Sequence, residues 1–196
     1  MKLWTIQPVD IYEKLLKEKV FHCDPHKSPL LQGDDGNFGA AYDWMAEQMR
    51  LRVGEPPQNV KYPIWGWYLL DGKNKKPDLR NYLFSNYTTR EACIEIEIDS
   101  SLVLLNDDGA WYAILYNAYL GLADSDEGIE AEDAWFESMP PDEQESVKRK
   151  SWERIFEISP KFQSGWHTHD YVQATFWEMK LEWVTDVRFF GKKVFE

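Results

Sequence analysis

Apolar and polar positions alternate most regularly between Cys93 and Asp99. Ile94, Ile96 and Ile98 occupy every second position there, and glutamates fill the positions between them. A period of two is typical of a strand with one buried face and one face in water, so we expect the glutamates to be exposed or to meet a basic partner. Two further strands are predicted over Leu3–Gln7 and Tyr62–Leu70, and a final strand or strand pair begins near Tyr171.

Helical spacing appears in four other segments. The first follows Pro8, which suits a first helical turn, and Ala41–Val53 forms the second before Gly54, Pro56 and Pro57. Asn106, Asp107 and Asp108 are possible N-caps for a third helix over Trp111–Leu120, with Gly121 as its stop, and a fourth is expected over 142–158. The stretch Pro25–Gly39 is expected to be a long loop. This order predicts one α+β domain over residues 1–196, with mixed or antiparallel sheets and flanking helices.

The acidic residues are concentrated in one segment. Residues 124–145 hold ten Asp or Glu and no Lys or Arg, which accounts for ten of the twelve excess negative charges. We interpret residues 123–147 as an acidic surface insertion. No basic stripe is left to neutralise phosphates, which argues against direct nucleic-acid binding and leaves a basic protein as a possible partner.

Apolar runs and cysteines indicate the cellular compartment. No apolar run approaches the roughly 18 residues of a membrane span, and the N-terminus has no apolar signal segment. Cys23 and Cys93 are too few for a disulfide framework. We expect a soluble cytoplasmic protein with free thiols.

The histidines fall into two groups. His22 and His26 flank Cys23, and His167 lies close to His169. These residue types bind zinc, but their spacing matches no zinc signature, so we expect hydrogen-bonding roles and no metal. A zinc site would require the two groups to adjoin.

Asp170 and Gln173 lie at the start of the last strand. Alternation places Gln173 and Thr175 on one face with Tyr171 and Trp177, and an apolar set on the other face. This composition is typical of a small-molecule cleft, and the alternative is a half-exposed edge strand. Arg80, in a polar loop, and Arg50, near a helix end, are candidate phosphate partners, although a solvated loop and a helix-dipole role explain them equally well.

Several motifs resemble those of an uncharacterised family of bacterial and phage proteins. They cover nearly the whole chain, and this resemblance implies membership without an activity. The motifs are Leu3-Trp4-Thr5-Ile6-Gln7, Ala41-Tyr42-Asp43-Trp44-Met45, Pro63-Ile64-Trp65-Gly66-Trp67, Lys76-Pro77-Asp78-Leu79-Arg80, Ser151-Trp152-Glu153 and Gln173-Ala174-Thr175-Phe176-Trp177.

The order of elements more distantly resembles the ADP-ribosyltransferase fold. Asp170-Tyr171-Val172 is similar to the Glu-Tyr-Ile/Val opening of the late strand of that superfamily. The resemblance implies NAD as cofactor. It assigns catalytic roles to Asp170 and Gln173, cofactor contacts to Trp4, Thr5 and Tyr42, and phosphate binding to Arg50 or Arg80.

Two departures shift this expectation from transfer toward binding. Trp4 stands where the superfamily usually has His or Arg, and Asp170 is one methylene shorter than the expected Glu. Setting a carboxylate back by more than about 1 Å can reduce a rate about 100-fold. We therefore expect binding of NAD or another nucleotide in a cleft between the first and last strands, with little transfer. The alternative is a non-enzymatic interaction module of phage or host defence that engages a basic partner through the acidic insertion.

Overall fold

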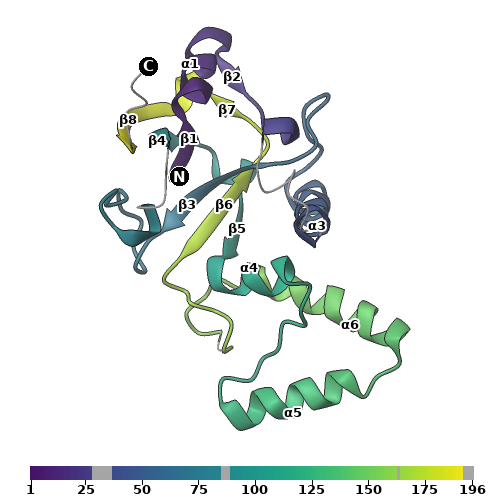
Figure 1. Ribbon diagram of the computed structural model, residues 1–196. Helices are drawn as coiled ribbons and strands as arrows, with labels where there is room; N and C mark the ends of the chain where they lie inside the picture. Colours follow the sequence, from purple (N-terminus) through teal and green to yellow (C-terminus); the bar gives the residue numbers. More distant parts are fainter. Residues whose placement is uncertain (28–36, 85–88, 163, 192–196) are drawn as a thin grey trace.

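The computed structural model describes residues 1–27, 37–84, 89–162 and 164–191. Its centre is a six-stranded antiparallel sheet, with the strands in the order β5-β6-β3-β1-β4-β8 (Figure 1). These strands are β1 (Lys2–Pro8), β3 (Ile64–Leu69), β4 (Arg90–Glu97), β5 (Leu104–Asp107), β6 (Val172–Phe176) and β8 (Val184–Gly191). A small second sheet pairs β2 (Val20–Phe21) with β7 (Met179–Lys180). The predicted α+β class is confirmed.

One face of the large sheet forms an apolar core beneath helix α1 (Val9–Glu18). Leu3, Ile94 and Ile96 are fully buried there, as are Ala174 and Phe176 of β6. Alternation along each strand delivers these side chains to the same side, which confirms the apolar face predicted for the last strand.

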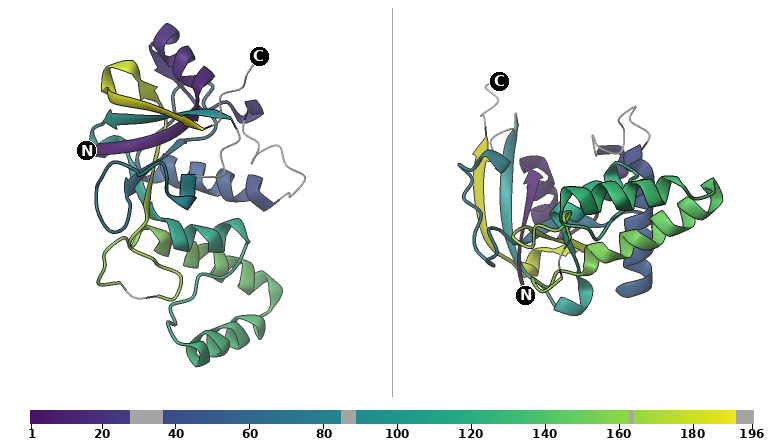
Figure 2. Two further views of the ribbon diagram at one scale, coloured as in Figure 1. Left: turned by 60° about the vertical axis from the view of Figure 1, so that its left-hand side comes forward. Right: turned by 90° about the horizontal axis from the view of Figure 1, so that it is seen from below.

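Helices cover part of the opposite face. Helix α3 (Asn37–Arg52) lies over β6, where the Thr175 hydroxyl is 3.2 Å from the Met49 sulfur. Helix α4 (Asp108–Leu115) follows β5 directly and packs with α3 and with α6 (Pro141–Trp152) around Trp44, Trp111 and Trp152. Helix α5 (Asp126–Glu137) has no buried residue, and Figure 2 shows the green segments extending away from the sheet. Short 3-10 turns complete the fold: η1 (Pro25–Lys27), η2 (Tyr82–Phe84), η3 (Ser100–Leu102), η4 (Glu153–Phe156) and η5 (Leu181–Trp183).

Of the two glutamates expected to be exposed or to meet a basic partner, Glu95 is not exposed. Glu95 is only 6% exposed, because it accepts hydrogen bonds from Trp4 and Thr185 and pairs with Lys2 at 2.8 Å. Glu97 is exposed as expected.

Other boundaries also differ from the predictions. Strand β5 was not predicted, helix α3 begins at Asn37, inside the expected loop, and α4 ends at Leu115, so Gly121 is not its stop. Helix α6 ends at Trp152 and continues as η4. Within the described residues, no helix combines the length and apolarity that crossing a membrane requires.

Candidate functional site

Buried polar side chains gather where β5 passes into α4. Asn106 and Asp107 are fully buried there, and the loop that precedes β6 brings histidines beside them. We call the following six residues the polar cluster: Asn106, Asp107, Asp108, His167, His169 and Gln173. Buried polar groups are normally fully hydrogen-bonded, so each exception needs a physical explanation.

Asp107 fastens the loop before β6 to the first turn of α4. One carboxylate oxygen accepts hydrogen bonds from the backbone N–H groups of Ala110 (3.0 Å) and Thr168 (3.2 Å). The other accepts from the N–H of His169 at 2.8 Å. Asp107 is therefore both the N-cap of α4, as predicted, and the anchor of a loop distant in sequence.

Gly109 allows that loop to approach the helix. A Cβ atom at this position would lie 2.5 Å from the Trp166 carbonyl oxygen. The run Asp107-Asp108-Gly109 thus brings the histidine loop to the start of α4.

Asp108 is the first residue of α4, and Gln173 is its hydrogen-bond partner. The Gln173 Nε2 donates to Asp108 Oδ1 over 2.6 Å. Burial, and then the neighbouring Asp107 charge, raise the pKa of the Asp108 carboxyl to about 6, although the Gln173 hydrogen bond opposes the rise. Asp108 consequently changes its protonation state near neutral pH, as acid–base groups in functional sites do.

Two amides in the cluster keep unused hydrogen-bonding capacity. Asn106 and Gln173 are paired directly across β5 and β6. Among the described residues, neither amide atom of Asn106 has a hydrogen-bond partner, and Gln173 Oε1 has none. The buried Trp65 Nε1 on β3 also lacks a partner within this set. Such groups are costly to bury unless water or a ligand satisfies them.

The two histidines of the cluster face each other with ring centroids 5.5 Å apart. His167 Nε2 lies 2.9 Å from the Arg154 carbonyl oxygen, and because a carbonyl only accepts, we assign the proton to Nε2. Burial lowers the pKa of His167, which favours the neutral ring, and with the proton on Nε2 its Nδ1 is an acceptor. The His169 Nδ1 lies 4.0 Å from Asp107 Oδ2.

The two histidine groups do not adjoin. His167 and His169 precede β6, whereas His22 lies 3.5 Å from Glu178, which follows β6. In the ranges that the structure describes, no group of three or more His, Cys, Asp or Glu is arranged to hold a metal ion.

The first strand does not face the last one as expected, because β3 lies between β1 and β6. Trp4 is 2% exposed, and its Nε1 donates to Glu95 Oε2 at 3.0 Å. The Thr5 hydroxyl donates to the Trp65 carbonyl oxygen at 2.7 Å. Both side chains thus make structural contacts within the sheet.

The other predicted site residues lie in separate places. Tyr42 packs against Trp65 and Trp111, and burial raises the pKa of its hydroxyl to about 12. Asp170 lies in the turn before β6, where its carbonyl accepts from Gly72 N–H at 2.8 Å. Arg50 lies over the Trp177 ring and Arg80 pairs with Asp78. Of the predicted set, Gln173 belongs to the polar cluster, and these placements do not form one cleft.

A family described as a domain of unknown function, DUF3841, matches residues 2–185. The chain belongs to the DUF3841 family. The predicted membership of an uncharacterised family is confirmed. No curated protein and no solved structure matches the chain, and the resemblance to ADP-ribosyltransferases gains no support from these comparisons.

Sequence reasoning missed most of the polar cluster. Asn106, Asp107 and Asp108 were interpreted only as helix caps, and the histidines as hydrogen-bonding residues or, less favoured, zinc ligands. The available signal was the run Asn-Asp-Asp-Gly directly after the apolar residues Leu102–Leu105. Such a run places several polar side chains at the point where a buried strand ends.

Proposed function

We propose that this DUF3841 protein binds a small nitrogen heterocycle, such as the base of a nucleoside or a nicotinamide, at the polar cluster. The observation that carries the proposal is the cross-strand pair of Asn106 and Gln173, with Asp108 hydrogen-bonded to Gln173. Asn106 brings an unused donor and an unused acceptor, and Gln173 an unused acceptor. Amides that donate and accept in one plane match the edges of such rings.

Asp108 adds a group that adapts to the ligand. With a pKa of about 6, its carboxyl offers an O–H donor below that pH and a carboxylate acceptor above it. A ring nitrogen that carries a proton would favour the carboxylate, and an unprotonated one would favour the acid. Ligand affinity should therefore depend on pH around the pKa of Asp108.

Aromatic side chains of β3, the strand beside β6, and of the helices α3 and α4 support a flat ligand. The Trp65 and Trp111 rings have centroids 4.8 Å apart, and Tyr42 is 5.7 Å from Trp65. Stacking on an aromatic ring contributes about 1–3 kcal/mol per base in single-strand binding proteins. The indole N–H of Trp65 provides a further donor.

The cluster favours a base or nucleoside over a phosphate-bearing ligand. Asp107 and Asp108 bring carboxyl groups to the site, and these repel phosphate when ionised. Arg50 and Arg80, the predicted phosphate partners, lie elsewhere. We therefore expect the nicotinamide or adenine part of NAD to bind better alone than as the intact dinucleotide.

Titrations with individual compounds test the proposal. Nicotinamide, the common nucleosides and NAD are added to the protein at millimolar concentration, and the indole N–H resonances are followed by NMR. A binding compound should move the Trp65 resonance, and Asn106→Leu should weaken its binding at least about tenfold, the effect of one lost charge-neutral hydrogen bond in a buried site. Glu97→Gln, on exposed β4 surface, is the control. No response to any compound, or full binding in Asn106→Leu, would refute the proposal.

Helix α5 supports a second candidate function, the docking of a basic protein. The helix is acidic throughout, and Trp135 and Ile129 are 49% and 39% exposed on it. Glu132 accepts from the N–H groups of Leu122 (2.8 Å) and Ala123 (3.0 Å), which holds the helix to the body. A rigid surface of this kind combines an aromatic anchor with charge of one sign.

A basic peptide separates this candidate from the first. Binding of a Lys/Arg-rich peptide should weaken with rising salt, and Trp135→Ala should weaken it further without changing nucleoside binding. Glu182→Gln, on η5, is the matched surface control. Binding that is insensitive to both salt and Trp135→Ala would exclude docking on α5.

A further inference from the structure

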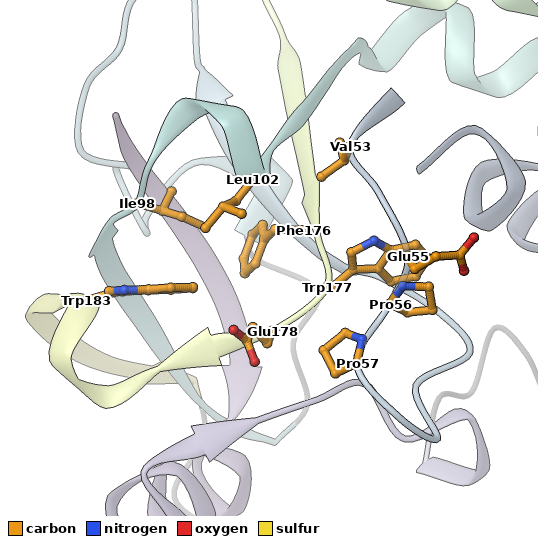
Figure 3. A pocket seen from close by; sticks show the side chains of 10 residues that line it. All are labelled: Val53, Glu55, Pro56, Pro57, Ile98, Leu102, Phe176, Trp177, Glu178 and Trp183. Atoms are coloured by element: carbon orange, nitrogen blue, oxygen red, sulfur yellow. The ribbon is translucent and has the colours of Figure 1, made fainter. Parts of the chain in front are cut away.

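A second site lies at the other end of β6 from the polar cluster. A pocket of about 270 Å³ opens there between the chain that follows α3, the turn η3 and the turn η5. Trp183 and Trp177 lie on opposite sides of it, with Phe176 between them (Figure 3). This volume is at the small end of ligand pockets, so it suits a group the size of one side chain.

The pocket walls are rigid and aromatic. The Trp177 indole donates from Nε1 to the Gly54 carbonyl oxygen at 2.8 Å, which fixes the ring plane. Pro56 and Pro57 close the side next to Trp177 (Figure 3). Because these side chains have few rotatable bonds, a ligand would lose little free energy in ordering them.

Two acidic residues belong to the same lining, and the carboxylate of Glu178 is the one on the side of Phe176 and Trp183. Glu178 lies below Phe176, and Glu55 lies beside Trp177 (Figure 3). Cations of the chain already lie over both indoles: the Arg50 guanidinium carbon is 5.9 Å from the Trp177 ring and the Lys180 Nζ is 5.2 Å from the Trp183 ring. Indole faces attract cations through their negative π surface.

We propose that this pocket binds a small organic cation with an alkylated ammonium head. The aromatic walls contact the alkyl groups and attract the charge, and Glu178 compensates it. An inorganic cation would leave the apolar walls unused, and a neutral apolar molecule would leave the carboxylate unused. The site is separate from the polar cluster and does not depend on the function proposed for it.

The positive groups around Glu178 limit the affinity. Lys180 Nζ lies 3.1 Å from one carboxylate oxygen and His22 Nε2 lies 3.5 Å from the other. A bound ammonium would compete with Lys180 for the same carboxylate. Removing the Lys180 charge should therefore tighten cation binding, whereas removing the Glu178 charge should weaken it.

Choline and its neutral carbon analogue, in which a tert-butyl group replaces the trimethylammonium head, test the proposal by calorimetry and by NMR of the Trp177 and Trp183 indoles. We expect choline to bind about tenfold more tightly than the analogue, as a cation–π contact with a partly desolvated charge provides. Glu178→Gln should remove most of that preference and Lys180→Gln should increase it. Glu182→Gln, on the same turn as Trp183, is the control. It should leave the preference for choline over the neutral analogue unchanged.

Three results would overturn the proposal. Equal binding of the two compounds would identify an apolar pocket without cation selectivity. Choline binding that leaves both indole resonances in place would put the cation elsewhere. If choline binds neither the wild type nor Lys180→Gln, the site is excluded. The variant makes this result decisive because it retains every aromatic wall.

Discussion

Replacing Asp108 by Asn should stabilise the protein at neutral pH. Asn has the shape of Asp, and its side-chain oxygen can still accept the hydrogen bond that Gln173 donates over 2.6 Å. What the substitution removes is a buried negative charge beside Asp107. Binding and catalytic groups typically lower the stability of the fold in this way.

The pKa of Asp108 sets the magnitude and the pH window. Folding raises that pKa from 3.8 to about 6, so the folded state binds more protons than the unfolded state between these values. Stability of the wild type therefore falls as pH rises from about 4 to 6, and the full penalty persists above pH 6. This rise in the pKa of Asp108 corresponds to a loss of about 3 kcal/mol of unfolding free energy at neutral pH. Solvent screening at a half-buried side chain reduces the loss to about 1–2 kcal/mol.

Urea unfolding at several pH values measures the effect. The free energy of unfolding of Asp108→Asn should exceed that of the wild type at pH 7.5, and the difference should vanish near pH 4. Asp107→Asn is the adjacent control with the opposite sign. The amide introduced by this substitution would direct N–H groups at backbone donors that Asp107 now satisfies. The Asp107→Asn variant should therefore lose about 2–3 kcal/mol of unfolding free energy. Equal unfolding free energies of Asp108→Asn and wild type at pH 7.5 would refute the reasoning.

Three further substitutions test the fold and the cluster. Glu95→Gln should lose about 2–3 kcal/mol of unfolding free energy at pH 7 and nothing near pH 2. The reason is that hydrogen bonds from Lys2, Trp4 and Thr185 outweigh burial and lower the pKa of Glu95 from 4.5 to about 2. Urea unfolding between these pH values checks the prediction. Gly109→Ala should lose more than about 2 kcal/mol in the same assay, since its Cβ would meet the Trp166 carbonyl, and a smaller loss would contradict the loop packing. Asn106→Leu should be neutral or stabilising, since it removes two unpaired polar atoms, and a loss of several kcal/mol would mean that ordered water satisfies them.

The elements that the sequence predicted well are those in which local pattern and tertiary packing agree. Strand β4 followed from the alternating isoleucines, and the apolar face of β6 from Val172, Ala174 and Phe176. The burial of Glu95 could not be predicted, because its partners come from β1, β8 and a distant loop. Alternation shows which side of a strand a residue takes and not what covers that side.

The polar cluster was hidden for the same physical reason. The hydrogen bonds that join β5 and α4 to β6 and the loop before it link residues more than sixty positions apart, such as Gln173 and Asp108. The sequence identified Gln173 and the Asn-Asp-Asp run separately, each with a local interpretation. Only the pairing of β5 with β6, two neighbours that are far apart in the chain, places the amides and the carboxyl together.

The adjacent residues Asp107 and Asp108 show how one site can use two carboxyl groups differently. Asp107 accepts three backbone N–H groups and serves the fold. Asp108 has a single described hydrogen bond, from a neutral amide, and its pKa moves to about 6. Different hydrogen-bond partners thus give these two neighbouring carboxyl groups different roles, one in the fold and one in the proposed site. Under the proposed function, the ligand supplies the next donor or acceptor for Asp108, and its affinity should follow the protonation of this one side chain.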